Sequence, residues 1–573
     1  MDSLDRLPDH LLLDIAQHLE TARDVCHVGR LSRRTQRLMQ MHGWRAFVGL
    51  RFPSMGIAGD ETTQWRAVAQ RLTRLDRCWE KRGFRLRLYE QEVRGRQSVA
   101  FQGLVDAAWD GQRELLACGV GEELVLRWRD SDDEWLGSQR HGYAAGRGDV
   151  SALCVCRGAQ RPAVVVGRAS GDVNVHSAAA PGSPPTKLLW PSAAQVSPGT
   201  SPGRTAITCA AWNAQRLLAA CARDTLVALH HVDAPETPLQ ALAVVDVSKP
   251  TSQASSRPLL HCLSFLGTDA LAWGIGPATD ALQCATIRPT GIDPPCPAYT
   301  PTPHQAPGTR HSVRAMEPIA NNPHLLLTAW SNGGYSLVDM RTPARHAVWY
   351  RDELQPFEPA HSLLAYGLER FVGGDHSEPL LRLFDFRWPK PYHHFNAMPC
   401  SNKSPWPPPP ASVLSRGREW QGYHEGAASN AAASHCDYIK GKQCKWHELS
   451  ALPAWRPDST LFLGLESSRG IFGLAKATDS SDSLYCGLRG GIMEVSLSLS
   501  GDTAASGAPP AAAPPGWKVQ SREASALMET GISCCTRGNK WHQREPIAPT
   551  QMWHHLPGRH DKAMRLDSAW SRP

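Results

Sequence analysis

The chain has 573 residues, of which 42% are hydrophobic and 20% are charged, the balance of an ordinary globular protein. Its net charge of +7 is spread too thinly over this length to indicate nucleic-acid binding by itself. Asp2, Asp5 and Asp9 interrupt any hydrophobic leader, and no apolar run reaches the length of a membrane span. We therefore expect an intracellular protein, cytoplasmic or nuclear, with reduced cysteines and with neither membrane nor nucleic acid as a partner.

The first 45 residues predict three short helices. Pro8 suits the first turn of a helix, and the apolar residues that follow it recur at helical spacing. We expect the second helix to end at Gly29 in a left-handed cap, and the third to begin at Ser32 and to reach about Met41, where Gly43 breaks it. A unit this small cannot bury its own apolar stripe, so the rest of the chain or a partner must cover it.

This segment resembles an F-box, the motif that docks substrate receptors onto the Skp-family adaptor of SCF-type ubiquitin ligases. The residues that carry the resemblance are Leu7, Pro8, Leu11, Leu12, Ile15, Leu19, Asp24, Val28, Leu31, Ser32, Arg33, Leu38 and Trp44. The resemblance implies that the adaptor contacts Leu7, Pro8, Leu11, Leu12, Ile15, Leu19, Val28 and Leu31. The alternative interpretation is an ordinary three-helix cap that packs on its own domain.

A basic helical connector is expected next, over residues 51–98. Nine arginines and one lysine occur in 66–96, while Trp65, Val68, Leu72 and Trp79 form a separate apolar side. Such a run of positive charge is most simply a solvated helix face.

Residues 99–498 repeat one pattern seven times, in which a β-rich run, a turn of small residues and a second β-rich run follow one another. The repeats begin near residues 104, 151, 207, 260, 313, 363 and 470, with a period of roughly 50 residues. Short strands at regular spacing predict a closed all-β ring. The pattern resembles a degenerate WD-repeat propeller, with Val338-Asp339 and Phe384-Asp385 at the position of the Trp-Asp pair. The fourth repeat lacks a clear last strand pair, so six or eight blades remain open.

The predicted fold class is thus α + β and multidomain: an F-box over 1–50, the connector, a seven-bladed propeller and a Pro/Ala-rich linker and tail over 499–573. Long insertions, expected to be disordered, interrupt the propeller at about 178–204, 288–310 and 388–460. The last insertion holds His435, Cys436, Cys444 and His447, a weak candidate zinc set beside the reading of ordinary loop residues. We expect no cofactor.

The sequence contains no motif for bond chemistry. A Gly-x-Ser-x-Gly elbow, a phosphate-binding Gly-Lys-Ser/Thr loop and a His-Glu-x-x-His helix are all absent. We therefore predict a binding protein and not an enzyme, with no catalytic residue. Arg223 and Arg489 occupy one repeat position, before the last inner strand, where receptors of this family that read phosphorylated motifs place arginines. The resemblance implies that they bind an acidic or phosphorylated protein substrate; the alternative is a pair of solvated loop arginines.

The resemblance as a whole implies the substrate-recognition subunit of an SCF-type E3 ubiquitin ligase, whose partners are a Skp-family adaptor with its cullin and a protein substrate. Two alternatives stay open. Asp339-Met340-Arg341 and Asp385-Phe386-Arg387 follow the Asp-x-Arg pattern of receptors for a cullin-four-type ligase. The propeller could instead be a non-degradative scaffold that binds peptides.

Overall fold

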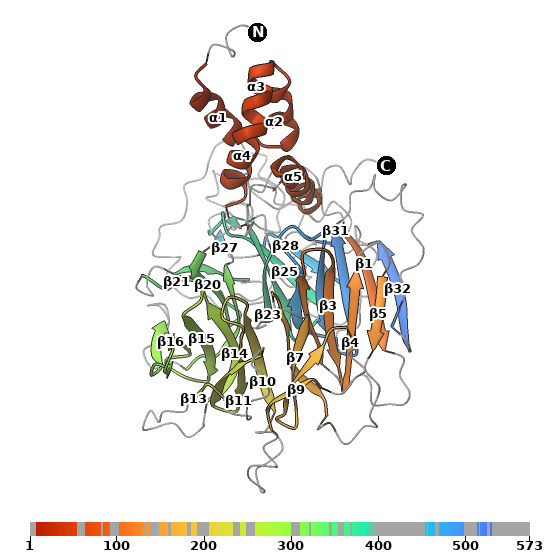
Figure 1. The fold of residues 1–573 in the computed structure, drawn as a ribbon, viewed down its shortest axis with the longest axis vertical. Coiled ribbons are helices and arrows are strands. Elements are labelled where there is room, and N and C mark those ends of the chain that lie inside the picture. Colours follow the sequence, from red (N-terminus) through yellow and green to blue (C-terminus); the bar gives the residue numbers. More distant parts are fainter. Residues whose placement is uncertain are drawn as a thin grey trace, which may run out of the picture.

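The computed structural model contains seven β-sheets arranged around a ring and a group of helices at one end of that ring (Figure 1). It describes residues 7–53, 55, 64–81, 84–91, 102–129, 133–137, 146, 148–158, 162–179, 185–191, 206–232, 241–247, 258–299, 310–319, 322–342, 347–352, 360–366, 369–389, 392–393, 453–454, 457–463, 469–497, 513–514, 516–523 and 528–529. The four zinc candidates, His435, Cys436, Cys444 and His447, lie outside these residues.

The amino-terminal unit has more helices than the sequence predicts. Its elements are α1 (Asp9–Gln17), α2 (Ala22–Gly29), α3 (Arg33–Leu38), the π-helical turn η2 (Met39–Gly43) and α4 (Trp44–Arg51), followed by α5 (Trp65–Lys81). Capping boxes begin α2 and α3, in which Thr21 pairs with Asp24 and Ser32 with Thr35. These side chains satisfy amide groups that have no partner inside the helix.

Three expectations about the helix ends are wrong. Pro8 is the N-cap of α1 in extended backbone and not a residue of its first turn. Gly29 is the last residue of α2, and the following Arg30 has right-handed helical angles, so no left-handed cap forms. Gly43 does not break the helix, because the chain continues from η2 into α4. A Cβ atom at Gly43 would overlap the side chain of Met39, so this glycine allows the two turns to pack closely.

Blades one to four follow one another along the chain, each as an antiparallel sheet. Blade one comprises β2 (Gly103–Trp109), β3 (Glu114–Val120), β4 (Glu123–Arg129) and β5 (Asp133–Gly137). Blade two comprises β6 (Val150–Cys156), β7 (Ala163–Arg168), β8 (Val173–Ser177) and β9 (Lys187–Trp190). Blade three comprises β10 (Ile207–Asn213), β11 (Leu218–Arg223), β12 (Leu226–His231) and β13 (Ala243–Asp246). Blade four comprises β14 (Leu259–Leu266), β15 (Ala270–Gly276), β16 (Leu282–Arg288), β17 (Gly291–Ile292) and β18 (Cys296–Tyr299).

Blades six and seven include strands that are distant in sequence. Blade five comprises β19 (Val313–Ile319), β20 (Asn322–Trp330), β21 (Tyr335–Asp339) and β22 (Val348–Tyr350). Blade six comprises β23 (Ala360–Tyr366), β24 (Arg370–Asp375), β25 (Leu380–Asp385), β28 (Ser459–Phe462) and β33 (Met528–Glu529). Blade seven comprises β29 (Ile471–Ala475), β30 (Ser483–Leu488), β31 (Gly491–Leu497), β1 (Phe84–Gln91) and β32 (Trp517–Glu523). A separate two-stranded sheet joins β26 (Tyr392–His393) and β27 (Pro453–Ala454).

The seven first strands contact one another in chain order, and β29 of blade seven contacts β2 of blade one, which closes the ring. The molecule is therefore a seven-bladed β-propeller with amino-terminal helices. Blade four, the uncertain repeat, obtains its outer strands from β16, β17 and β18. The last two of these begin at Gly291 and Cys296, inside the expected insertion 288–310, and β9 begins at Lys187 inside the expected insertion 178–204.

Strand β1 joins the amino-terminal part of the chain to the last blade. It runs antiparallel to β31, with Phe84 opposite Leu497 and Tyr89 opposite Ile492, and β32 pairs on its other side. In its described residues, the expected connector of residues 51–98 thus holds the helix α5 and the propeller strand β1. Pairing with a strand from the far end of the sequence ties the two ends of the ring together and covers the edge of β31.

A buried charge cluster fixes the junction between blades one and seven. The guanidinium of Arg127, which is fully buried, donates at 3.1 Å to the carboxylate of Glu494 and at 3.2 Å to the hydroxyl of Tyr89 in β1. Burial opposes ionisation of Glu494, but Arg127, Arg129 and Arg87 outweigh it and hold the pKa of this carboxyl well below its usual range. The cluster therefore joins three strands from three parts of the chain.

Candidate functional site

The amino-terminal helices place some apolar side chains inside and leave others exposed. In α1, Leu12 is 1% exposed and packs in the core, whereas Leu11 is 40% and Ile15 is 38% exposed. Leu11 and Ile15 are four residues apart, so they lie on one face of the helix. Leu31, between α2 and α3, is 43% exposed. The helical unit thus leaves apolar surface in contact with solvent.

The remaining residues of the predicted adaptor set differ in burial. Leu7, Leu19 and Val28 are half-buried against the same core as Leu12, and Pro8 is exposed. Arg34 in α3 donates to the carbonyl of Leu7 at 2.7 Å and to the carboxylate of Asp9, which holds the start of α1 against α3. The sequence prediction treated the eight residues as one surface, but an α-helix turns its successive side chains to different sides, and Leu12 faces inward.

The helical unit and the propeller share one hydrophobic core. This core extends from Leu12 in α1 through α4 and α5 to Leu497 in β31. Trp79 of α5 contacts Tyr366 of blade six and Phe84 of β1, with ring centroids 5.4 Å and 5.1 Å apart. Large aromatic contacts of this kind fix α5 in position on the ring.

Asp76 of α5 adds an ionic connection to this attachment. It is nearly buried, and its carboxylate accepts from Arg370 of β24 at 2.8 Å and from Arg51 of α4 at 3.4 Å. One carboxylate thus joins two helices and a propeller blade. The helices have a defined orientation relative to the blades, as Figure 1 shows.

A set of residues that the sequence prediction missed lies at one end of the innermost strands, around the axis of the ring, and we call this place the channel mouth. In six blades the first strand carries a β-bulge near its start, where two of its residues face one residue of the second strand. The extra residues are Ser151, Thr208, His261, Arg314, His361 and Phe472. A bulge redirects a side chain, and these are less buried than the residue before each of them.

From blade four to blade seven the bulge residues follow one another around the ring and, with His376, form a mostly polar group. The guanidinium of Arg314 lies 3.4 Å from a ring nitrogen of His261, and His361 stacks on His376 at 4.0 Å. His376 in turn contacts Phe472 at 5.1 Å. Burial and Arg314 lower the pKa of His261 to about 4, and burial, His376 and Arg314 lower that of His361 to about 3. These imidazoles are therefore neutral at physiological pH, and Arg314 carries the positive charge.

Arg489 belongs to this group, whereas Arg223 lies elsewhere on the same end of the ring. Arg489 follows β30, and its guanidinium lies 5.7 Å from the centre of the Phe472 ring. Arg223 ends β11, stacks on Trp190 at 4.1 Å and donates to the carbonyl of Pro191 at 3.0 Å. The prediction that the two arginines occupy one repeat position is wrong by one residue, because Arg223 pairs with Ile207 as Leu488 pairs with Ile471, whereas Arg489 lies in the turn after β30. Blades three and seven also give them separate surroundings.

The helices and this channel mouth lie at opposite ends of the propeller. Strand β1 leaves α5 at Phe84, beside the end of β31, and reaches Gln91, whose amide donates to the carbonyl of Gly490 next to Arg489. Eight residues of strand span about 25 Å. A protein held by the helices would therefore be separated from one held at the mouth by the thickness of the ring.

The two Asp-x-Arg segments are occupied by internal ion pairs. Arg341 donates to the carboxylate of Asp339 at 2.8 Å and 3.0 Å, and Arg387 pairs with Asp385 at 2.7 Å. The side-chain bonds from Arg341 lower the pKa of Asp339 to about 2. Arg387 is close enough to Asp76 of α5 for their charges to interact, so this segment lies beside the helices, while Arg341 stays exposed to solvent.

Within the described residues, no group of three or more metal-ligating side chains comes together, and no helix is long and apolar enough to cross a bilayer. The described segments contain eleven cysteines, none of which forms a disulfide bond. Eight of them are buried or half-buried in strands of the propeller, namely Cys118, Cys154, Cys156, Cys209, Cys221, Cys262, Cys284 and Cys486. They serve there as small apolar side chains.

No family model and no curated protein matches the chain. Among solved structures it is similar to Sqt1 of Chaetomium thermophilum, determined in complex with the N-terminus of the ribosomal protein L10. The two chains are 10% identical, the match covers 67% of this chain and 81% of that chain, and the TM-score is 0.38. The seven-bladed propeller is therefore identified by its own sheets and not by this likeness.

Proposed function

We propose that the chain is a substrate-recognition subunit of an SCF-type ubiquitin ligase, in which the amino-terminal helices bind a Skp-family adaptor and the propeller binds a protein substrate. One observation carries the proposal. The helical unit exposes Leu11, Ile15 and Leu31, although it is packed on the ring by a core that includes Leu12. Exposed apolar side chains on a small helical unit are typical of a surface that a partner covers.

The positions of the helices and of the channel mouth, at opposite ends of the propeller, support a role based on proximity. A receptor of this kind breaks no bond itself; it holds the substrate near a second enzyme and raises the effective concentration of the reacting groups. That role requires a fixed relation between the two binding surfaces. The common core from Leu12 to Leu497 and the ionic connection through Asp76 supply such a relation.

The polar group at the channel mouth supports a substrate with negative charge. Arg314 and Arg489 bring two guanidinium groups to blades five and seven, where neutral imidazoles of His261 and His361 add hydrogen-bonding groups. Guanidinium groups bind carboxylate and phosphate in a defined geometry. We therefore place the substrate at this mouth, with Arg489 as its principal arginine and Arg223 as a peripheral one.

Adaptor co-purification tests the proposal. The full chain is co-expressed with a Skp-family adaptor, either unchanged or as the Leu11→Asp/Ile15→Asp double variant. Burying one large aliphatic side chain contributes about 1.5–3 kcal/mol, so loss of two should reduce adaptor binding by more than about a hundredfold. The matched control is Leu242→Asp/Leu259→Asp, because these propeller residues are 46% and 50% exposed.

Loss of the adaptor in the first variant and its retention in the control would support the assignment, provided that both variants melt like the unchanged chain. Retention in both would contradict it. The cullin that co-elutes separates the SCF-type complex from the cullin-four-type complex. Accumulation of substrate on deletion of residues 1–45 separates a degradative receptor from a non-degradative scaffold.

A further inference from the structure

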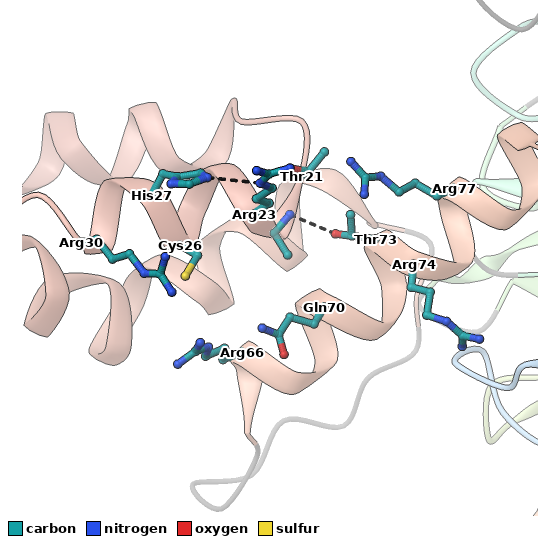
Figure 2. Close-up of a pocket in the computed structure, with 11 residues that line it drawn as sticks. Thr21, Arg23, Cys26, His27, Arg30, Arg66, Gln70, Thr73, Arg74 and Arg77 are labelled. Atoms are coloured by element: carbon teal, nitrogen blue, oxygen red, sulfur yellow. Dashed lines mark hydrogen bonds between the residues drawn. The ribbon is translucent and has the colours of Figure 1, made fainter. Parts of the chain in front are cut away.

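A cleft of about 440 Å³ lies between α2 and α5 (Figure 2). It is lined neither by the exposed residues Leu11, Ile15 and Leu31 nor by residues of the channel mouth. The residues that line it are Thr21, Ala22, Arg23, Cys26, His27, Arg30, Arg66, Gln70, Thr73, Arg74 and Arg77. The amide of Ala22 donates to the hydroxyl of Thr73 at 3.2 Å, which holds the two helices together at the base of the cleft. The cleft is thus part of the folded helical unit and does not require a movable loop.

Five arginines follow the length of this cleft. Arg23 in α2 and Arg30, which directly follows this helix, are two turns apart. Arg66 and Arg77 are three turns apart on α5, so the positive charge extends over about 16 Å. In Figure 2, Arg30 and Arg66 lie toward one end and Arg74 and Arg77 toward the other. The guanidinium groups are therefore distributed along a line and do not converge on one point.

The charge in the cleft is only partly balanced by the protein. No acidic side chain is among the described residues that line it. Arg74 forms an ion pair with Asp482 of blade seven at 3.6 Å, and Arg23 donates to His27 at 3.3 Å. Arg23, Arg30, Arg66 and Arg77 are all exposed. Anionic groups that entered the cleft would relieve repulsion between the arginines and form charge-assisted hydrogen bonds.

We propose that this cleft binds an extended acidic segment of a partner protein, whose anionic side chains are aspartate, glutamate or phosphoserine. The linear distribution of the arginines fits groups spaced along a polypeptide better than a compact polyphosphate. Single-stranded nucleic acid fits less well, because it is usually held by large aromatic side chains that stack on its bases, and no phenylalanine, tyrosine or tryptophan is among the described residues that line the cleft. The proposal does not depend on the ligase function, since it concerns a different surface.

Fluorescence anisotropy with the full chain tests this site. The probes are labelled decapeptides of alternating glutamate and serine, the same peptide with phosphoserine, and a neutral version with glutamine. Arg30→Gln/Arg66→Gln removes one arginine from each side of the cleft, and we expect it to weaken binding of both acidic peptides at least about tenfold. The control Arg33→Gln/Arg37→Gln makes the same change of charge on exposed residues of α3 outside the cleft, and less than a twofold change is expected.

A second pair, Arg23→Gln/Arg77→Gln, repeats the test if the first pair lowers the melting temperature. Binding of the glutamate peptide that is lost in the cleft variants supports the site and identifies carboxylate as a ligand group. Binding of the phosphoserine peptide alone, lost in the same variants, supports the site and identifies phosphate as the ligand group. Equal loss in the control variant overturns it, because net charge alone would then explain binding. Tighter binding of a dT10 oligonucleotide through the same arginines, or full displacement of the peptide by equimolar inositol hexakisphosphate, overturns the assignment to a polypeptide.

Discussion

The propeller and the helical unit differ in how far their apolar and charged side chains are buried. The ring closes on itself through β1, and its charged side chains Arg127, Glu494 and Arg382 are buried in ion pairs. The helical unit leaves Leu11, Ile15 and Leu31 exposed and surrounds a cleft with arginines. The ring pairs these buried charges within itself, whereas the helices present groups that a partner can satisfy. The difference suggests that the ring supplies rigidity and the helices supply association.

The buried ion pair of the ring gives the largest expected effect. Arg127→Met removes the fully buried cation that pairs with Glu494 at 3.1 Å and leaves Arg129 as its remaining close partner. Removal of one partner from a buried pair destabilises a protein by about 3–5 kcal/mol. Denaturant unfolding followed by tryptophan fluorescence measures the loss. Arg288→Met is the control, because Arg288 forms an exposed pair with Asp293 at 2.7 Å and should unfold like the unchanged chain. Equal stability of the two variants would show that the Arg127 cluster does not hold the ring closed.

Adjacent leucines of α1 give the next largest effect and test the division between inside and outside. Leu12→Ala removes a buried side chain and should lower the free energy of unfolding by about 2–5 kcal/mol. Leu11→Ala changes an exposed side chain and should stay within about 0.5 kcal/mol of the unchanged chain. The midpoints of denaturant unfolding measure the change in stability of both variants. If the two variants were equally stable, the helical unit would not be packed on the ring through Leu12.

The pH dependence of stability gives a smaller effect and concerns Glu494 in the ring. Its pKa is depressed in the folded protein, because Arg127 and Arg129 outweigh the cost of burial. The unfolded chain therefore takes up a proton near its ordinary pKa of 4.5 while the folded protein does not, and stability falls as the pH drops below that value. One such group contributes at most about 1.4 kcal/mol per pH unit.

Glu494→Gln should accordingly show a flatter decline between pH 5 and pH 3, although it is less stable at pH 7. Glu122→Gln is a suitable control, since Glu122 lies in the turn between β3 and β4 and is only half-buried. Parallel pH profiles for the unchanged chain and Glu494→Gln would contradict the assigned role of this carboxylate.

Most of the ring could be predicted from the sequence because the second strand of each blade is largely buried on both faces, as in β7 and β11. Such strands are continuous apolar runs, for example 163–167 and 217–221, and they are visible without an alignment. The outer strands could not be predicted because they are short and half exposed, as β9 and β13 are. Strand β1 carried a signal that was missed: Phe84-Arg85-Leu86-Arg87-Leu88 alternates apolar and polar residues with the period of a strand.

The candidate sites were less predictable for two physical reasons. The bulge residues that surround the channel have no chemistry in common, since serine, histidine, arginine and phenylalanine occur at one position, so only the register of the strands reveals them. The arginine-lined cleft joins α2 to α5, and the sequence showed only the α5 part, as a basic run with the solvated-face alternative. Contact between elements distant in sequence cannot be obtained from the spacing within either one.

The smallest expected effect compares two arginines at the channel mouth. Arg489 lies over Phe472 within the polar group of blades four to seven, whereas Arg223 is engaged with Trp190 and the carbonyl of Pro191. Arg489→Ala should therefore weaken binding of phosphorylated peptides about fivefold, roughly 1 kcal/mol, and Arg223→Ala should weaken it less. Anisotropy with phosphorylated and unphosphorylated peptide pools measures both variants. Equal binding of both peptide pools to every variant would show that the channel mouth binds no anion. A larger loss of binding in Arg223→Ala would place the anion site at blade three, because Trp190 would then hold the guanidinium of Arg223 in position for the ligand.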